Sequence, residues 1–535
     1  MLQVNVISLK SSELQEIIEQ MHPTLRTISD RLVNVFSLFS TLTETDIPQS
    51  ERLISTRDLF KWCSRVAVDF DVSNKDSKLR VLQDAIDVFC CSYPKIEDRL
   101  VLAIKISSYF NIIPEQANYF CNQYKPNVVV TSEKITIGRC TLQRINCCDS
   151  VPLKYCFTRP AACLLEKVAI CVSRNEPLLL VGETGTGKTS TVQYLANLMG
   201  QKLTVINMNQ QSDSADLLGG FKPVDMKFIM GPVKMEFEDV FCSYFNSEHN
   251  KKFLSNINYC YNTQRYYDLV KLMKKSYEAA MERLKNISYK SLDTNEEIKY
   301  KNSKKRNVLK DELHKRLWTN FGKKLLKLEQ QIKQKNELAF AFIKGSLVKA
   351  IENGYFVLLD EINLTSPETL DALLGLLENS GGSISLIEKG DKTPISRHPN
   401  FRLFACMNPS TDVGKHNLPT GLRNRFTEFF VDELTEKNDL LHLVSSYLEA
   451  MSLKTEKLER IVKFYLNIRK EAVSSLCDGL GHKPHFSLRT LCRSLMIASK
   501  STFGSTRSLY EAFCLSFLTQ LDRKSYCLVE EMIVK

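Results

Sequence analysis

The stretch LLLVGETGTGKTSTVQYLANLMG, residues 178–200, decides the fold of this chain. Its first four residues are an apolar run typical of a buried strand, and the residues from Lys188 onward are typical of a helix that ends at Gly200. Between them, residues 182–189 follow the pattern G-x-x-x-x-G-K-[ST]. A strand, a glycine-rich turn and a helix in this order favour a phosphate-binding loop over an ordinary glycine turn.

The residue types of this loop indicate how it would hold a nucleotide. Glycines let successive backbone N–H groups curl around phosphate oxygens, Lys188 neutralises the charge of the β- and γ-phosphates, and the hydroxyl group of Thr189 ligates Mg²⁺. We therefore predict ATP and Mg²⁺ as cofactors. The predicted nucleotide-binding residues are Gly182, Glu183, Thr184, Gly185, Thr186, Gly187, Lys188, Thr189 and Ser190.

A second motif, YFVLLDE at residues 355–361, supplies the acidic partner of the loop. A hydrophobic strand would deliver Asp360 to its carboxyl end, where the carboxylate can hold Mg²⁺, usually through water. Glu361 would then face the γ-phosphate and could orient and deprotonate the attacking water. Many strands end in acidic turns, so this prediction depends on the phosphate-binding loop upstream.

Two further motifs carry candidate polar groups. Asn408 ends the strand-like run FACMNP, residues 404–409, and could hydrogen-bond the attacking water or the γ-phosphate, although an asparagine before a proline is also an ordinary turn residue. Arg423 and Arg425 lie in LPTGLRNRFTEFF, residues 418–430. A guanidinium group at the γ-phosphate stabilises transition-state charge, and a surface salt bridge is the alternative; we favour Arg425 over Arg423.

The pattern along the chain predicts an α/β protein. Strand-like runs alternate with helical ones between residues 123 and 433, which indicates a parallel sheet in a three-layer core. Residues 1–122 and 434–535 have the apolar spacing of helices. The stretch 236–340 is also helical. Near its end, an apolar face is predicted at Leu313, Leu317, Phe321, Leu325, Leu328 and Ile332.

Charge is concentrated in one part of the chain. Residues 251–340 contain 22 Lys and Arg against 10 Asp and Glu, whereas the whole chain has a net charge of +11. The basic character therefore belongs to the predicted helical insert, which could contact RNA or an acidic partner; solvated lysines on amphipathic helices are the alternative. No apolar run is long enough to cross a bilayer, so no membrane contact is expected. Seventeen cysteines without a C-x-x-C spacing indicate reduced, buried thiols.

The order of these motifs resembles the AAA+ ATPases: phosphate loop, acidic strand end, polar sensor strand, arginine, then a helical lid. The sequence of these motifs is similar to that of the midasin family, a group of very large six-module AAA+ proteins of ribosome assembly. The resemblance rests on LLLVGETGTGKTSTVQYLA, LTVINMNQQSDSADLLGGFKPVD, GSLVKAIENGYFVLLDEINL and HPNFRLFACMNPSTDVGKHNLPTGLRNRFTE. It covers most of residues 150–500 and implies that residues 236–340 are the helix-2 insert of that family.

An internal repeat extends the resemblance to both ends of the chain. The phrase STRDL at residues 55–59 and the phrase SLRTL at residues 487–491 each follow a strand-like and helical stretch of similar length. Residues 1–122 are therefore expected to be the helical lid of a preceding AAA+ module whose core is absent. Residues 123–433 would be a complete core and residues 434–535 its lid. By the order of the family, the chain would be a fragment with the end of the first module and the second module.

The resemblance also implies roles for the arginines. Arg489 would be a sensor of a bound nucleotide, either in cis or in trans on a neighbour's site, and Arg57 would be its counterpart for the missing module. A helix-surface arginine is the alternative. Arg425 would act in trans on the preceding site, and the finger for the site of Lys188 and Glu361 would come from a following module. We therefore expect the isolated chain to bind ATP but to hydrolyse it slowly.

The resemblance implies a remodelling ATPase of large ribosomal subunit assembly and export. Its expected partners are neighbouring AAA+ modules in a ring, the pre-ribosomal particle and assembly factors, and its expected location is the nucleus, both nucleolus and nucleoplasm. The run KYKNSKKR, residues 299–306, is a candidate import signal. The alternative function is a nucleotide-stabilised scaffold whose basic insert contacts RNA or protein. A metal-chelatase-type or helicase-type ATPase is less favoured, because the sequence has no metal-ligand cluster and no base-reading element.

Overall fold

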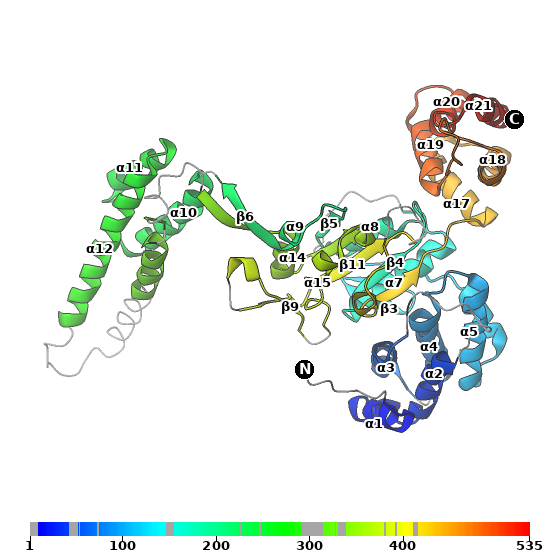
Figure 1. Ribbon diagram of the computed structural model, residues 1–535, viewed down its shortest axis with the longest axis horizontal. Coiled ribbons are helices and arrows are strands. Elements are labelled where there is room, and N and C mark those ends of the chain that lie inside the picture. Colours follow the sequence, from blue (N-terminus) through cyan, green and yellow to red (C-terminus); the bar gives the residue numbers. More distant parts are fainter. Residues whose placement is uncertain are drawn as a thin grey trace. The chain divides into compact units, whose positions relative to one another are not determined.

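The computed structural model (Figure 1) forms two compact units, residues 219–344 and the rest of the chain, which are described separately. The description covers residues 9–41, 52, 54–71, 74–145, 155–224, 226–245, 248–290, 314–326, 328–329, 339–378, 381–390, 393–409 and 416–534. Among these residues, no helix has both the length and the hydrophobicity that a bilayer crossing requires.

A five-stranded parallel sheet forms the centre of the larger unit. Its strands are β4 (Leu178–Val181), β5 (Leu203–Asn207), β8 (Phe356–Asp360), β11 (Arg402–Met407) and β12 (Thr427–Phe430), in the order β12-β4-β11-β8-β5. The register pairs Val181 with Met407 and Asn207 with Asp360. The carboxyl ends of these strands therefore meet along one edge of the sheet.

The sheet forms because its strands are apolar and helices cover them. All four residues of β4 are buried, as are the first four of β8, and such continuous apolar runs are typical of parallel strands covered on both faces. Helices α8 and α14 pack on the sheet. The helices of the core are α7 (Arg159–Ser173), α8 (Lys188–Met199), α9 (Ser214–Leu218), α14 (Ser346–Asn353), α15 (Pro367–Asp371) and α16 (Thr420–Arg423).

Shorter elements complete the core. They are the antiparallel strands β1 (Val128–Val130), β2 (Lys134–Ile137) and β3 (Cys140–Gln143), the pair β9 (Ser383–Ile384) and β10 (Ile395–Ser396), and the 3₁₀ turns η3 (Ile362–Leu364) and η4 (Ile387–Lys389). Strand β3 packs against α7, so the small sheet covers the helix that precedes the phosphate loop.

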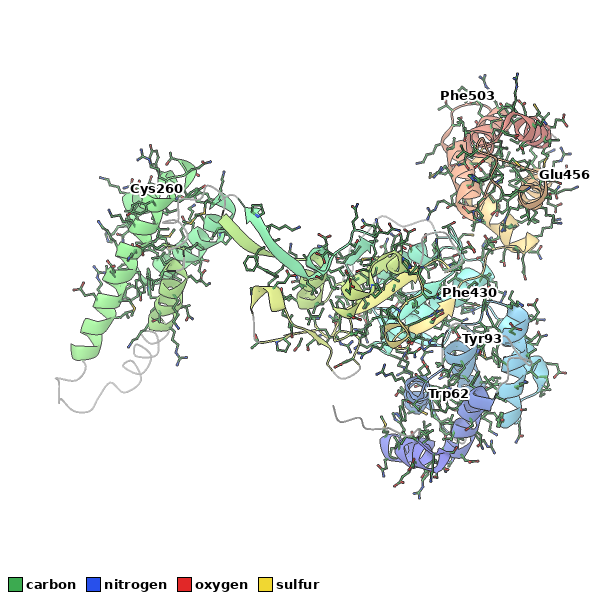
Figure 2. The ribbon with its side chains drawn as sticks, viewed as in Figure 1. Trp62, Tyr93, Cys260, Phe430, Glu456 and Phe503 are labelled. Atoms are coloured by element: carbon green, nitrogen blue, oxygen red, sulfur yellow. The ribbon has the colours of Figure 1, made fainter. Side chains whose placement is uncertain are left out.

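The N-terminal helices share one hydrophobic core with this sheet. They are α1 (Ser11–Met21), α2 (Ser29–Thr41), α3 (Thr56–Asp69), α4 (Lys75–Ala85), α5 (Ile96–Tyr109) and α6 (Pro114–Asn122), with the 3₁₀ turn η1 (Pro23–Leu25) and the π-helical turn η2 (Ile86–Cys90). Trp62 is fully buried among them (Figure 2) and packs edge-on against Phe89 and Phe110. The same apolar cluster continues through Leu178 and Phe429 of the sheet, so these helices and the core fold as one body.

Buried charges line the seam between the N-terminal helices and the core. Arg65 donates to both carboxylate oxygens of Glu176, at 2.8 and 2.5 Å, and Arg99 does the same to Asp432 at 2.6 and 2.9 Å. The ammonium group of Lys61 donates to the carbonyl oxygen of Arg425 at 3.2 Å. Burial lowers the pKa of Lys61 to about 8. These contacts tie α3 and α5 to residues that flank the nucleotide core.

The C-terminal helices form a separate apolar cluster and repeat the pattern of the N-terminal ones. They are α17 (Lys437–Tyr447), α18 (Thr455–Ser474), α19 (Leu488–Lys500), α20 (Ser505–Phe513) and α21 (Arg523–Val534), with the turns η5 (Glu449–Met451) and η6 (Cys514–Leu518). Ser55 precedes α3 and Ser487 precedes α19, each as the N-cap residue. In both bundles the next helix leads into a π-helical turn. The repeated phrase of the sequence therefore marks the same position in two similar helical bundles.

The smaller unit combines a pair of antiparallel strands with a helical cluster. Its strands are β6 (Gly219–Val224) and β7 (Ala339–Lys344), and its helices are α10 (Met226–Tyr244), α11 (Lys251–Asn262), α12 (Tyr266–Lys290) and a helix over 314–326. Phe321, Leu325 and Leu328 are buried as predicted, but Leu317 is 38% exposed and Trp318 is buried in its place. The prediction for Leu317 was wrong because the large ring of Trp318 takes the inner position. Leu313, Ile332 and the candidate import signal lie outside the described residues.

The described cysteines are free thiols, and the expectation that they are buried holds only in part. Cys63, Cys90, Cys91, Cys140, Cys171 and Cys406 are buried, whereas Cys242 and Cys527 are exposed. Cys406 lies in β11, and burial raises the pKa of its thiol to about 12. At neutral pH this thiol is therefore protonated and acts as a small apolar side chain of the sheet.

The ion pair of Arg65 and Glu176 generates a stability prediction. We expect Glu176→Gln to lower the free energy of unfolding by about 3–5 kcal/mol, because Arg65 would keep a buried charge without its counter-ion. The double variant Arg65→Met/Glu176→Leu should recover most of this loss. The measurement is urea denaturation followed by the fluorescence of Trp62 in a Trp318→Phe background. Glu456→Gln, at an exposed position of α18, is the control.

The same ion pair predicts a pH dependence. Burial alone would raise the pKa of Glu176, but the ion pair with Arg65 outweighs it, so the pKa lies below its usual value of 4.5. The stabilisation is therefore complete above pH 4.5 and is lost as the pH falls below that value. The difference between wild type and Glu176→Gln should shrink on acidification. A difference that is constant down to pH 3 would contradict this interpretation.

Candidate nucleotide site

Two glycines with positive φ shape the loop between β4 and α8. Gly185 and Gly187 have φ angles of 87° and 89°, which residues with a β-carbon rarely adopt. The turn lets α8 begin at Lys188, and the hydroxyl group of Thr191 donates to the carbonyl oxygen of Gly187 at 2.9 Å. A glycine-rich turn before a helix N-terminus offers free backbone N–H groups and the positive end of the helix dipole, which together suit a phosphate.

Lys188 connects the loop to the neighbouring strand. Its side chain is buried, and its ammonium group donates to the carbonyl oxygens of Gly182 and Glu183 at 2.6 and 2.7 Å and to Oδ1 of Asn408 at 3.2 Å. Asn408, at the end of β11, is buried as well. The structure therefore brings the predicted phosphate-binding lysine and the predicted sensor asparagine into direct contact.

Thr189 and Asp360 form a second contact across the sheet edge. The hydroxyl group of Thr189 donates to Oδ2 of Asp360 at 3.1 Å. A hydroxyl and a carboxylate oxygen at this separation fit Mg²⁺, which prefers oxygen ligands and keeps several waters. Within the described residues, no group of three or more His, Cys, Asp and Glu side chains offers another metal site. The pair of Thr189 and Asp360 is thus the candidate magnesium site.

Glu361 has an unusual backbone conformation at the end of β8. Its φ angle is 55°, in the left-handed region, and its N–H group donates to Oδ1 of Asp360 at 3.1 Å. Its side chain is exposed. Such conformations in residues other than glycine cost free energy and cluster at functional sites. The geometry is compatible with the predicted role of Glu361 as the base for the attacking water.

Asn363 is a residue of the site that the sequence reasoning missed. It is buried, and its Nδ2 group donates to the carbonyl oxygen of Asn408 at 3.1 Å. This bond links the turn after β8 to the end of β11 and so holds the two predicted polar strand ends together. A signal was present, because Asn363 is an amide between two aliphatic residues directly after the acidic pair.

The two arginines of the motif before β12 have different environments. Arg423 is buried and donates to both carboxylate oxygens of Glu428, at 2.9 and 2.8 Å, so it forms a structural ion pair. Arg425 donates through Nη1 to the carbonyl oxygen of Leu374 at 2.6 Å, and its own carbonyl oxygen accepts from Lys61. Its guanidinium group lies 3.8 Å from the carboxylate of Glu378, and within the described residues it forms no hydrogen bond or ion pair with the loop 182–189. Its side chain therefore faces the residues after α15, and its backbone carbonyl faces α3.

Arg489 lies beside the phosphate loop. It is the second residue of α19, and a methyl group added to Gly185 would lie 3.0 Å from its backbone nitrogen and 3.5 Å from the β-carbon of Ser487. Its side chain is exposed, as is that of Arg57 at the same position of α3. The C-terminal helices therefore contact the loop of their own chain at this point.

Comparison with known proteins identifies each part of this arrangement. Residues 177–255 and 326–426 match the AAA domain of the dynein-related subfamily, and residues 13–113 and 439–535 each match a midasin AAA lid domain. The chain belongs to the midasin family. The predicted fold class is confirmed: an α/β AAA fold with a five-stranded parallel sheet and a helical lid domain on either side in sequence. The AAA domain implies a P-loop ATPase.

Curated relatives support the family assignment. The chain is 37% identical to midasin of Dictyostelium discoideum over 92% of its residues, which correspond to 9% of that protein. It is 30% identical to midasin of Giardia intestinalis over 90% of its residues, or 11% of that protein. The chain thus spans about a tenth of the length of these midasins.

The contact between α19 and the loop predicts different effects for two glycine variants. Gly185→Ala and Gly187→Ala would suffer similar backbone strain, because both positions have positive φ. Only at Gly185 would the methyl group press on α19, since no atom lies within 4 Å of a methyl group at Gly187. We expect amide hydrogen exchange of residues 487–491 to accelerate roughly tenfold in Gly185→Ala. Equal acceleration in both variants would show that the contact is not specific.

Proposed function

We propose that this chain is an ATP-binding and ATP-hydrolysing module of a midasin-like remodelling ATPase. The observation that carries the proposal is the pair of contacts across the sheet edge: Lys188 to Asn408 at 3.2 Å and Thr189 to Asp360 at 3.1 Å. They support this proposal because the residues proposed as the phosphate-binding cation, the polar sensor and the two magnesium ligands lie close together. Few other functions require these four groups behind a glycine-rich loop.

The geometry supports a separate role for each of these residues. Residues 182–190 would bind the phosphates through backbone N–H groups, and Lys188 would turn from its carbonyl partners toward the β- and γ-phosphates. Bound Mg²⁺, held by Thr189 and Asp360, would neutralise phosphate charge. Glu361 would accept a proton from the attacking water, and Asn408 would orient that water.

The arginines support action between modules. The backbone of Arg425 contacts Lys61 of the N-terminal lid, and its side chain binds Leu374 and not the loop 182–189, so we propose that it serves in trans the site of a preceding module. The backbone nitrogen of Arg489 lies beside Gly185 in the phosphate loop of the same chain, which favours a sensor role in cis. Because α19 touches Gly185, nucleotide turnover would move the lid against the core.

The biological setting of the proposal rests on family membership alone. We propose that the module acts in large ribosomal subunit assembly and in export from the nucleus, in the nucleolus and nucleoplasm. Its partners would be adjacent AAA modules in a ring, the pre-ribosomal particle and assembly factors. The alternative, a scaffold whose basic insert contacts RNA or protein, draws support from residues 219–344, which fold as a compact unit of their own.

Two variants test nucleotide chemistry. We expect Lys188→Ala to weaken ATP binding roughly a hundredfold, because a charge-assisted contact to the phosphates is lost. Glu361→Gln should bind ATP normally but reduce hydrolysis about a hundredfold or more, since the general base is removed. Calorimetry with Mg-ATP and single-turnover hydrolysis measure the two effects. Normal ATP affinity in Lys188→Ala would contradict the site, and normal function of Glu361→Gln in particle release would favour the scaffold.

A third variant tests the trans role of Arg425. Arginine fingers contribute about 10³–10⁵ in rate, so the chain by itself should hydrolyse ATP slowly. Arg425→Ala should leave this slow turnover unchanged, because the residue would serve another module. Steady-state phosphate release by the purified monomer is the measurement. Fast turnover that disappears in Arg425→Ala, with an unchanged thermal melt, would show that the arginine acts in cis.

A further inference from the structure

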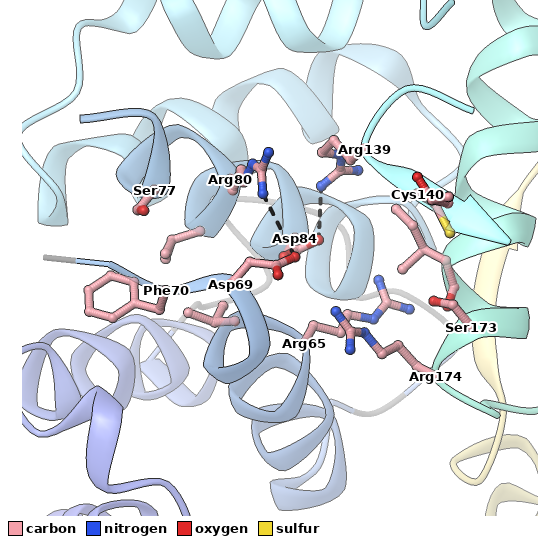
Figure 3. A pocket seen from close by; sticks show the side chains of 14 residues that line it. Arg65, Asp69, Phe70, Ser77, Arg80, Asp84, Arg139, Cys140, Ser173 and Arg174 are labelled. Atoms are coloured by element: carbon pink, nitrogen blue, oxygen red, sulfur yellow. Dashed lines mark hydrogen bonds and ion pairs between the residues drawn. The ribbon is translucent and has the colours of Figure 1, made fainter. Parts of the chain in front are cut away.

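The net charge of the chain belongs to the smaller unit. Residues 219–344 contain 26 Lys and Arg against 15 Asp and Glu, so they carry the whole formal net charge of +11, whereas the rest of the chain has 46 basic and 46 acidic residues. Even where arginines gather in the larger unit, carboxylates neutralise them: in the cavity of Figure 3, Arg139 binds Asp84 at 2.8 Å and Arg65 binds Glu176. The excess positive charge of the smaller unit favours an anionic partner.

The smaller unit also holds the three most exposed aromatic rings among the described residues. Phe221 is 55% exposed, Tyr259 is 59% exposed and Tyr267 is 57% exposed, whereas no other Phe, Tyr or Trp in the described ranges exceeds 50%. Aromatic side chains are large and apolar, so most of them lie in a core. Rings that stay in water on a basic surface are suited to stack on unpaired bases.

One of these rings shares a flank of α12 with two lysines. Tyr267, Lys271 and Lys275 are exposed and follow one another at intervals of four residues, so they lie on successive turns of the same side of the helix. Leu269 and Met273, on the other side of α12, are buried in the apolar cluster of the unit, where α12 packs against α10 and α11 (Figure 1). We call the side with Tyr267, Lys271 and Lys275 the basic flank of α12.

The lysines along this flank differ in their partners. Lys274 donates to a carboxylate oxygen of Glu329 at 2.8 Å, whereas Lys271 and Lys275 form no ion pair within the described ranges. A hollow of about 250 Å³ runs beside all three lysines and Tyr267, and Glu278 is its other acidic residue. The basic flank therefore offers two ammonium groups to an anion next to an exposed ring.

Single-stranded nucleic acid fits this combination better than an acidic protein segment does. Each nucleotide carries a phosphate group for an ammonium group and a base with a flat face for an aromatic ring. Carboxylates of a peptide would pair with Lys271 and Lys275 but would leave the ring of Tyr267 unused. In a duplex the bases are stacked inside the helix, so only the phosphate groups would be accessible to this flank.

We propose that the basic flank of α12 binds single-stranded nucleic acid, with a base stacked on Tyr267 and backbone phosphate groups on Lys271 and Lys275. The proposal rests on the alternative function given above, a scaffold whose insert contacts RNA or protein, and it names the partner. It does not depend on ATP binding or hydrolysis at Lys188. Because the three side chains lie on successive turns, the strand would run along the axis of α12.

The experiment is fluorescence anisotropy of a labelled oligouridylate of about ten nucleotides, titrated with the full chain at several salt concentrations. We expect Tyr267→Ala to weaken binding about tenfold, because a stacked base is lost, and Tyr267→Phe to bind like wild type, because the ring remains. The ring is exposed, so neither variant should change the thermal melt.

A pair of charge variants tests the phosphate contacts. Lys271→Gln/Lys275→Gln should weaken binding and reduce the slope of log affinity against log salt by about 1.4, since two phosphate contacts to a single strand are removed. Lys463→Gln/Lys470→Gln, at exposed positions of α18, removes the same charge elsewhere and is the matched control, which should keep the affinity and the slope of wild type.

Three results would overturn the proposal. Oligoglutamate that binds as tightly as the oligouridylate, with full affinity of Tyr267→Ala for both, would assign the flank to an acidic protein. Loss of oligouridylate binding in Lys188→Ala but not in Tyr267→Ala would assign the strand to the phosphate loop. No binding at about 100 μM protein and low salt would exclude even non-specific affinity. Calorimetry with Mg-ATP tests the ATPase separately, so each proposal can fail without the other.

Discussion

The position of β11 between β4 and β8 is the constraint on which the nucleotide site depends. In a parallel sheet the carboxyl ends of the strands lie along one edge, so residues far apart in sequence become neighbours only through strand order. Here Lys188 follows β4 and reaches Asn408 at the end of β11, while Thr189 reaches Asp360 at the end of β8. Asn363 then ties the turn after β8 back to β11. Each polar group is thus held by a neighbouring strand before any ligand arrives, which is the preorganisation that phosphoryl transfer needs.

The N-terminal helices, which match a midasin AAA lid domain, pack directly on this core. Its apolar cluster runs without a break from Leu14 in α1 to Phe429 in β12, so the N-terminal lid is packed on the core that follows it in sequence. Buried ion pairs such as Arg65 with Glu176 favour this one packing arrangement of lid and core, because a shifted arrangement would leave charges buried without partners. The hydrogen bond from Lys61 to the carbonyl oxygen of Arg425 joins the seam to the arginine motif. A movement of α3 would therefore act directly on the backbone of Arg425.

The two lids differ in what they contact. The C-terminal lid has its own apolar cluster and meets the phosphate loop through the start of α19, whereas the N-terminal lid shares its core with the sheet. A lid that rests on the loop can respond to nucleotide, and a lid that is fused to the following core can transmit that response.

The sequence by itself determined the loop 182–189, the acidic end of β8 and the repeated lid phrase, because these signals are local: a glycine turn after an apolar strand, a carboxylate at a strand end, a serine before a helix. It also favoured Arg425 over Arg423. Only the tertiary structure decided that Arg423 is neutralised by Glu428, that Asn363 belongs to the site, and that Trp318 replaces Leu317 in the core of the insert. The pairing of Arg65 with Glu176, 111 residues away, was likewise not visible in the sequence. Such contacts depend on how helices and strands pack, and a charged or aromatic residue in a sequence does not state which distant partner will face it.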